Sequence, residues 1–150
     1  MPRNLTGALL VTVCCLFAAG CGDKTVTDHA VLLNDVDSVI SQVNSFTAEL
    51  AGTVESAPDT NAGVLAAQKL LDSRKAELAA AIAALKADAK FQQNAAAKRK
   101  WLEAEVDNTE RVSRLQVKYL DASMRDPAFK ARLDKLVADY DSMFKDPAGH

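Results

Sequence analysis

The stretch between Gly63 and Pro127 contains neither glycine nor proline, and this constrains the fold more than any other feature of the chain. The sequence on both sides is rich in alanine, leucine, valine and charged residues, a composition that favours helix. Apolar residues recur at steps of three and four, which is the spacing of one face of an α-helix. We therefore expect an all-α protein whose long amphipathic helices each bury one apolar stripe.

Four apolar stripes mark the expected helices. The first helix, expected over 28–51, carries Leu33, Val36, Val39, Val43, Phe46 and Leu50. The second carries Val64, Ala67, Leu71, Leu78, Ile82, Leu85 and Ala89. The third carries Leu102, Val106, Val112, Leu115 and Tyr119, and the last carries Phe129, Leu133, Leu136, Tyr140 and Met143. Such spacing is typical of the a/d seams that close a helical bundle or coiled coil.

Turn and cap residues separate these helices. Gly52 suits the position just after the first helix, and the loop over 55–61 includes Asp59 and Thr60, either of which can cap the second. Asp126-Pro127 is a cap followed by proline at the first helical position. Asp146-Pro147 is expected to end the last helix.

The region around Asn94 decides the overall shape. If the chain turns there, it forms an antiparallel bundle of three to four long helices. If it does not, residues 62–123 form one central helix of roughly 90 Å with a hairpin at each end. The alanines at 95–97 favour a continuous helix, but a continuous helix leaves Phe91 and Trp101 little to pack against. We therefore expect the antiparallel bundle.

The amino-terminal segment predicts export. An apolar run over 8–19 follows Arg3, and no acidic residue precedes Cys21. The run is shorter than the roughly 20 residues that span a bilayer, and its flanks are those of a secretory signal peptide. The small residues 18–20 lie directly before Cys21, and this arrangement resembles the lipobox of bacterial lipoproteins. The resemblance covers about the first 21 residues, and Ala18 stands where leucine is most usual.

The lipobox resemblance implies a lipid anchor on Cys21. The chain would be cleaved after Gly20, the Cys21 thiol would carry diacylglycerol, and the new amino terminus would carry a fatty acid such as palmitate. In enteric bacteria, aspartate directly after the lipidated cysteine favours retention in the inner membrane. Here that position is Gly22, which by analogy implies the outer membrane, facing the periplasm. In a Gram-positive cell the same signal implies the outer face of the plasma membrane. The alternative is an ordinary secretory signal with a chance cysteine near its end.

These features divide the chain into four parts. They are a signal peptide over 1–20, a lipidated tether over 21–27, a helical bundle domain over 28–146 and a C-terminal tail over 147–150. Cleavage removes Cys14 and Cys15, and lipid would modify Cys21, so the mature chain keeps no free thiol for a disulfide or a cysteine metal site. We expect no metal and no cofactor.

Charge is distributed unevenly along the chain. Residues 25–68 contain six acidic residues and no lysine or arginine, whereas residues 69–150 contain sixteen basic and thirteen acidic residues. Either the acidic first helix docks against the basic ones, or Asp35, Asp37 and Glu49 present an acidic face to a basic partner. Surface charge pairs add little stability, so the pattern bears on the choice of partner.

The run Lys98-Arg99-Lys100-Trp101 is a second candidate partner surface, because cations beside an interfacial aromatic ring can contact anionic headgroups. The alternative is a solvated helix face with Trp101 turned into the core. Nucleic acid is not an expected partner, since the expected location lies outside the cytoplasm and the pI is near 5.7.

The sequence predicts a binding role and no catalysis. His29 and His150 are the two histidines, and neither an HExxH pattern nor a glycine-rich phosphate loop occurs. We expect a membrane-anchored structural or protein-interaction module of the cell envelope, which binds an unknown envelope protein or a second copy of itself through its seams. The alternative is a periplasmic binding protein or holdase-type chaperone that shelters apolar segments.

Overall fold

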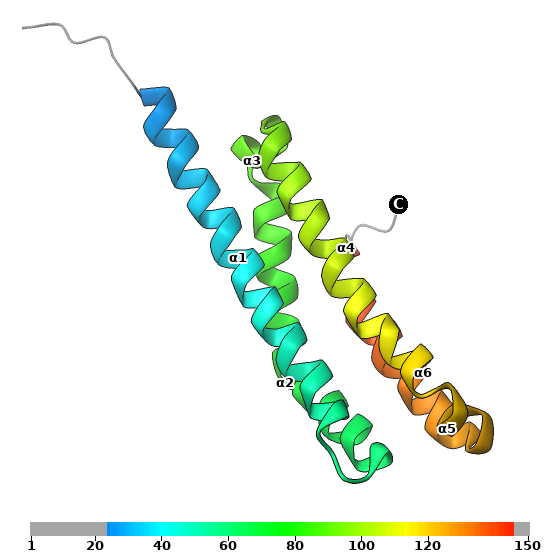
Figure 1. Ribbon diagram of the computed structural model, residues 1–150. Helices are drawn as coiled ribbons and strands as arrows, with labels where there is room; N and C mark the ends of the chain where they lie inside the picture. Colours follow the sequence, from blue (N-terminus) through cyan, green and yellow to red (C-terminus); the bar gives the residue numbers. More distant parts are fainter. Residues whose placement is uncertain (1–23, 146–150) are drawn as a thin grey trace, which may run out of the picture.

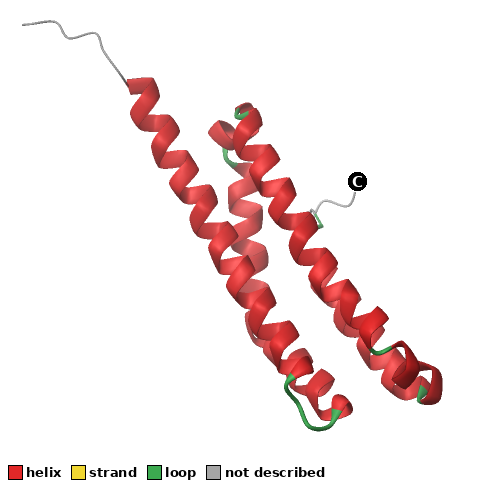
Figure 2. Ribbon diagram, in the orientation of Figure 1, coloured by secondary structure: helices red, strands yellow, loops and turns green. Residues whose placement is uncertain are grey.

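The computed structural model describes the backbone of residues 24–145 and the side chains of residues 35–145. Every regular element in this part is a helix, which confirms the expected all-α class (Figure 2). The helices are α1 (Lys24–Glu55), α2 (Thr60–Ala87), α3 (Ala89–Gln93), α4 (Ala95–Lys118), α5 (Leu120–Arg125) and α6 (Pro127–Asp141). The expected signal peptide, Cys21 and the tail over 147–150 lie outside the described residues.

Four helices, α1, α2, α4 and α6, form a bundle (Figure 1). Helix α1 lies beside α2 and α4, and α6 lies beside the same two helices, so α1 and α6 are diagonal neighbours. Helices α1 and α4 run in the same direction, because Asp37 pairs with Lys100 near one end and Glu55 pairs with Lys118 near the other. The chain therefore forms the expected antiparallel bundle as two helical hairpins, α1–α2 and α4–α6.

The chain turns twice near the expected position, and the alternative of one helix over 62–123 is wrong. The Asp88 carboxylate accepts hydrogen bonds from the backbone N–H groups of Lys90 and Phe91 at 2.7 and 2.9 Å. The Asn94 side chain accepts one from Ala97 N at 3.0 Å. The Asp88 cap starts α3 and the Asn94 cap starts α4, so the chain turns without glycine or proline. Each side chain accepts from backbone N–H groups that have no partner within their own helix.

The α1–α2 turn depends on close contact between backbones. A Cβ atom on Gly63 would lie 2.8 Å from the Ala57 Cβ and 2.9 Å from the carbonyl oxygen of Val54. Asp59 caps α2 by accepting a hydrogen bond from Asn61 N at 2.9 Å. Gly63 therefore lets the start of α2 approach the end of α1 at a distance that no larger residue permits.

The core runs the length of the bundle. Its side chains come from all four long helices and from α3, with Phe46, Leu71, Leu133 and Tyr140 among those that are fully buried. The Phe46 and Tyr140 rings stack with centroids 6.5 Å apart, which joins the diagonal helices α1 and α6 across the centre. The predicted stripe of the last helix is confirmed, because all five of its members are buried.

Two expected helix boundaries differ from the structure. Helix α1 begins at Lys24 and ends at Glu55, whereas the sequence predicted 28–51 with a tether over 21–27. The helix continues through Gly52 because Val54 extends the apolar stripe and is fully buried. Helix α6 ends at Asp141, before the predicted stop at Asp146, and the following turn folds Met143 and Phe144 into the core.

The predicted stripes of the second and third helices are wrong in part. Leu102 and Val106 are 57% and 54% exposed, and Ala89 is also exposed. The buried face of α4 instead carries Ala97, Trp101, Asn108, Val112 and Leu115. Val112 and Leu115 are buried as the sequence predicts, but a polar residue, Asn108, occupies a core position, so the apolar pattern misplaces the buried face in the first half of α4.

Candidate interaction surfaces

The acidic residues of α1 meet cations of the neighbouring helices. Lys100 of α4 pairs with Asp37, and the Nη1 atom of Arg74 on α2 lies 3.7 Å from Glu49 Oε2. Asp35 is exposed and lines a shallow apolar recess between α1 and the end of α2. Two of the three acidic residues predicted to bind a partner are thus engaged in ion pairs between helices.

The three cations predicted as a second surface lie in the first turns of α4. All three side chains are exposed. Arg99 Nε lies 3.8 Å from Glu103 Oε1 on the same helix, and Lys100 pairs with Asp37 across the α1–α4 boundary. The structure therefore leaves Lys98 and Arg99 facing outward, while Lys100 also contributes to helix docking.

Trp101 lies in the core and apart from these cations. Its side chain is 4% exposed, and its Nε1–H donates a hydrogen bond to Glu105 Oε2 at 2.8 Å. The indole packs against the Phe144 ring with centroids 6.3 Å apart. The ring thus anchors the end of the chain after α6, and it is not placed to contact a surface partner.

A set of exposed apolar side chains lies on α4 and α5. Leu102, Val106 and Val117 lie on α4, and Leu120 and Met124 on α5, each more than half exposed. Leu65 on α2, which is 50% exposed, is the other large apolar side chain exposed to this degree in the described part. The exposed apolar surface is therefore concentrated on one helix pair, which the sequence pattern did not reveal because it assigned Leu102 and Val106 to the core.

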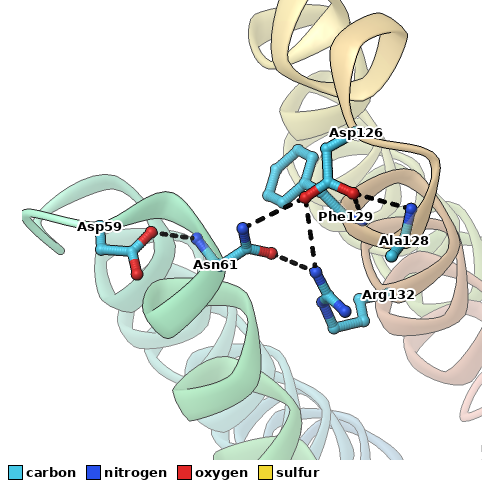
Figure 3. A network of polar contacts seen from close by, with 6 residues as sticks. All are labelled: Asp59, Asn61, Asp126, Ala128, Phe129 and Arg132. Carbon is cyan, nitrogen blue, oxygen red and sulfur yellow. Dashed lines mark hydrogen bonds and ion pairs between the residues drawn. The ribbon is translucent and has the colours of Figure 1, made fainter.

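A polar cluster, which we call the clasp, joins the starts of α2 and α6 (Figure 3). Asp126 Oδ1 accepts hydrogen bonds from the backbone N–H groups of Ala128 and Phe129 at 2.9 and 3.0 Å. Its Oδ2 atom accepts one from Asn61 Nδ2 at 3.4 Å and lies 3.8 Å from Arg132 Nη2. Arg132 also donates to Asn61 Oδ1. These contacts fix one hairpin to the other.

Hydrogen bonds hold the pKa of Asp126 below its ordinary value, and the one from the Phe129 N–H has the largest effect. Desolvation acts in the opposite direction and is smaller. The clasp therefore favours the charged form of the carboxylate, which is the form that accepts all of these hydrogen bonds.

Two polar contacts involve buried side chains, and the second reaches the exposed Asn44. Thr47 hydrogen bonds to the Tyr140 hydroxyl across the bundle, and the Thr47 hydroxyl also lies 2.8 Å from the carbonyl oxygen of Val43. Burial raises the pKa of Tyr140 to about 12. Asn108 Nδ2 donates to Asn44 Oδ1 at 2.5 Å, which links α4 to α1. Both contacts satisfy buried polar groups, so they specify how the helices align.

An apolar recess lies between α2 and the turn after α6. Its volume is about 340 Å³, and its walls include Ala79, Ala83, Ile82, Met143 and Phe144. Lys86 lies at its side and donates a hydrogen bond to the carbonyl oxygen of Phe144 at 2.7 Å. The recess is at the lower limit of ordinary ligand pockets, so it suits a small apolar group at most.

None of the helices that the structure describes is long and apolar enough to cross a membrane. The side chains described over 35–145 include no group of histidine, cysteine or acidic residues that could hold a metal ion. Comparison of the chain with known protein families, curated proteins and solved structures finds no match. The function is therefore argued from the residues and geometry of this chain.

Proposed function

We propose that this chain is a lipid-anchored protein of the bacterial cell envelope that acts as a structural or protein-interaction module. The observation that carries the proposal is Cys21, which follows three small residues and an apolar, acid-free segment. Helix α1 begins at Lys24, so only two residues separate the proposed lipid from this helix. Lipid on Cys21 would therefore tether the bundle to the membrane through the first turns of α1.

The interior of the bundle supports a binding role without catalysis. The polar side chains at its centre, Thr47 and Tyr140, bond to each other, and the buried Asn108 bonds to the exposed Asn44. Catalytic sites commonly hold polar groups that point into an open cleft with shifted pKa values. Here the strongly shifted group, Tyr140, is fully buried against Phe46, where no substrate can reach it.

The acidic residues of α1 stay a proposed contact for a basic partner. Asp37 and Glu49 already pair with Lys100 and Arg74. Exposed ion pairs of this kind contribute about 0–1 kcal/mol each, so a basic partner can compete with them. Asp35 is exposed on the α2 side of α1, whereas Asp37 lies on the α4 side, so a basic partner would contact one or the other.

The apolar recess beside Met143 and Phe144 is the observation that favours the alternative, a periplasmic binding protein or holdase. Alanine side chains form much of its wall, and its volume of about 340 Å³ accommodates one or two side chains. The holdase alternative predicts that the bundle suppresses aggregation of an unfolded client at equimolar ratio. The module proposal predicts no such suppression.

Metabolic labelling with a fatty acid tests the anchor. The Cys21→Ser variant should lose the label and accumulate as the uncleaved precursor. Cys14→Ser and Cys15→Ser are matched controls, because each removes a thiol from the same segment and should leave labelling unchanged. Labelling of the Cys21→Ser variant at the normal level would contradict the proposal. Crosslinking in native membranes, with the labelled protein as bait, would then identify its envelope partner.

A further inference from the structure

We propose that the outward side of the first three turns of α4, which carries Lys98, Arg99, Leu102 and Val106, docks on an anionic lipid surface. We call this side the α4 outer face. The inference rests on the proposed function, because the lipid on Cys21 would bring this surface within reach of the bilayer.

The four residues share one side of the helix. Lys98, Leu102 and Val106 follow one another at steps of four, and Arg99 lies three residues before Leu102. All four side chains are exposed, Leu102 and Val106 by 57% and 54%. Cations next to apolar side chains on one helix face are typical of helices that lie in a membrane interface, where the apolar groups enter the headgroup region.

The α4 outer face lies toward the end of the bundle at which the anchor attaches. Helices α1 and α4 are parallel, since Asp37 pairs with Lys100 and Asn44 bonds to Asn108. Figure 1 shows the start of α1 and the start of α4 at the same end of the molecule. The anchor and the cations therefore face the same membrane.

The cations near the turn between α2 and α4 are the charged groups that would face an anionic surface. Residues 85–101, which form the end of α2, α3 and the start of α4, contain five lysines or arginines and one carboxylate, Asp88, whereas residues 103–107 add three carboxylates. Two of the cations bond within the protein, Lys86 to the Phe144 carbonyl oxygen and Lys100 to Asp37, so the positive charge of the α4 outer face comes from Lys98 and Arg99. Glu103 also lies near the α4 outer face, where it pairs with Arg99. Anionic headgroups attract each nearby cation by an amount that falls off within a Debye length of about 8 Å.

The distances require the bundle to lean. Because Lys100 pairs with Asp37, Lys98 lies about level with Asp35, which is roughly 16 Å along α1 from Lys24. An upright bundle would thus hold Lys98 about two Debye lengths from the lipid. Three residues of extended chain reach about 10 Å, and packed helix axes lie about 8–10 Å apart. A leaning bundle can therefore place both the anchor and the α4 outer face on one bilayer.

The same face is a poor fit to a helix of a second copy. Continuing along α4 from Val106 at steps of three and four leads to Thr109 and Ser113, which interrupt the apolar stripe before Val117. A coiled-coil seam needs apolar residues at successive a and d positions. A lipid interface does not require apolar residues at regularly repeated positions. An interrupted apolar stripe with flanking cations therefore fits a lipid interface better than it fits a second helix.

Vesicle binding tests this inference without the lipid anchor. The chain over 22–150 is suitable because all the described core residues lie between Val36 and Phe144. We expect it to cosediment with vesicles that contain phosphatidylglycerol. It should bind weakly to vesicles of pure phosphatidylcholine, and weakly to the phosphatidylglycerol vesicles when the salt concentration is high. Lys98→Gln with Arg99→Gln should reduce the partition coefficient on the order of 25-fold, about fivefold per cation. Leu102→Gln should reduce it roughly fivefold.

Matched controls come from the opposite end and from α2. Arg125→Gln with Lys130→Gln removes one arginine and one lysine, as the test variant does. Leu65→Gln alters a side chain that is 50% exposed, similar to Leu102. Both should leave partitioning unchanged. Equal losses in test and control variants, or no preference for phosphatidylglycerol, would overturn the inference. So would a dimer that Leu102→Gln dissociates. Because this chain carries no lipid, a failure here is distinct from a failure of Cys21 labelling.

Discussion

The two ends of the bundle are held in different ways. At the end where α2 and α6 begin, the clasp links the two hairpins through Asn61, Asp126 and Arg132, and Gly63 brings the backbones of α1 and α2 together. Contacts there are made within the protein, between segments 65 to 71 residues apart in the sequence.

At the opposite end, the chain turns through local caps at Asp88 and Asn94, and it leaves cations and apolar side chains exposed on α4. Local caps fix the turn. The hairpins are joined here by the surface pair of Asp37 and Lys100 and by the hydrogen bond from Lys86 to the Phe144 carbonyl oxygen. Val117, Leu120 and Met124 are also exposed, and they lie toward the clasp end, so exposure alone does not distinguish the two ends. We infer from the contacts that the clasp end contributes more to stability, and we propose that the end at which α1 begins contacts a membrane.

Gly63→Ala should destabilise the clasp end most. The new Cβ would lie 2.8 Å from the Ala57 Cβ and 2.9 Å from the Val54 carbonyl oxygen, and a backbone atom cannot rotate away. We expect the free energy of unfolding to fall by roughly 3 kcal/mol in urea titrations. Gly52→Ala is the control, because a Cβ there meets nothing within 4 Å. It should stabilise α1 by up to about 1 kcal/mol, and a loss of similar size in both variants would contradict the account.

Tyr140 should make the centre of the bundle sensitive to alkali. Burial raises the pKa of its hydroxyl to about 12, so the folded state favours the neutral form. This stability is fully present below pH 10 and is lost as pH rises from 10 to about 12, by roughly 2–3 kcal/mol. Circular dichroism in urea at several pH values measures the loss. Tyr140→Phe keeps the ring stacked on Phe46 and should remove most of the pH dependence between 10 and 12.

Asp126 should make the clasp end sensitive to acid. Hydrogen bonds lower the pKa values of Asp126, Asp134 and Asp139, so their stabilisation is present above about pH 4 and is lost as pH falls through their lower folded values. Burial raises the pKa of Asp141, which acts in the opposite direction. Asp126→Ala should lower Tm by roughly 5 °C at pH 7 and flatten the acid dependence.

At the end of the bundle opposite the clasp, Asp88→Ala is the variant that corresponds to Asp126→Ala. The Asp88 side chain caps only the short helix α3. This substitution should lower Tm by less than Asp126→Ala does. Calorimetry that finds a larger effect for Asp88→Ala would reverse the assigned roles of the two ends.

Lys98→Gln with Arg99→Gln should change stability least. The Lys98 side chain is exposed, and the Arg99–Glu103 pair is a surface contact at 3.8 Å. We expect Tm within about 2 °C of the unmodified chain, because surface substitutions of this kind are nearly neutral. A larger fall would show that these cations hold the fold, and the end near Cys21 would then differ less from the clasp end than we infer.

The sequence predicts the helices and the turn near Asn94 because those features are local. The stripe of Phe129, Leu133 and Leu136 is uninterrupted, and the structure buries all three residues. The face of α4 could not be predicted, since Asn108 occupies a core position while Leu102 and Val106 are exposed. Asn108 hydrogen bonds to Asn44, which comes from a distant part of the chain and which no local pattern links to α4.

The candidate surfaces were predicted less well than the fold. The sequence identifies Asp37 and Lys100 as charged, but the pair that they form across helices depends on tertiary packing. The clasp joins Asn61 to Arg132, which are 71 residues apart, and no local pattern marks either residue. Contacts between distant segments depend on how the two hairpins align, and a stripe of apolar residues does not determine that alignment.

The proposed location depends most on the anchor at Cys21, and mass spectrometry of the protein purified from its native membranes tests this anchor most directly. We predict an amino-terminal peptide that begins at Cys21, with diacylglycerol on the thiol and no peptide from residues 1–20. A chain that retains residues 1–20, or one cleaved elsewhere with an unmodified Cys21 thiol, would contradict the proposed location.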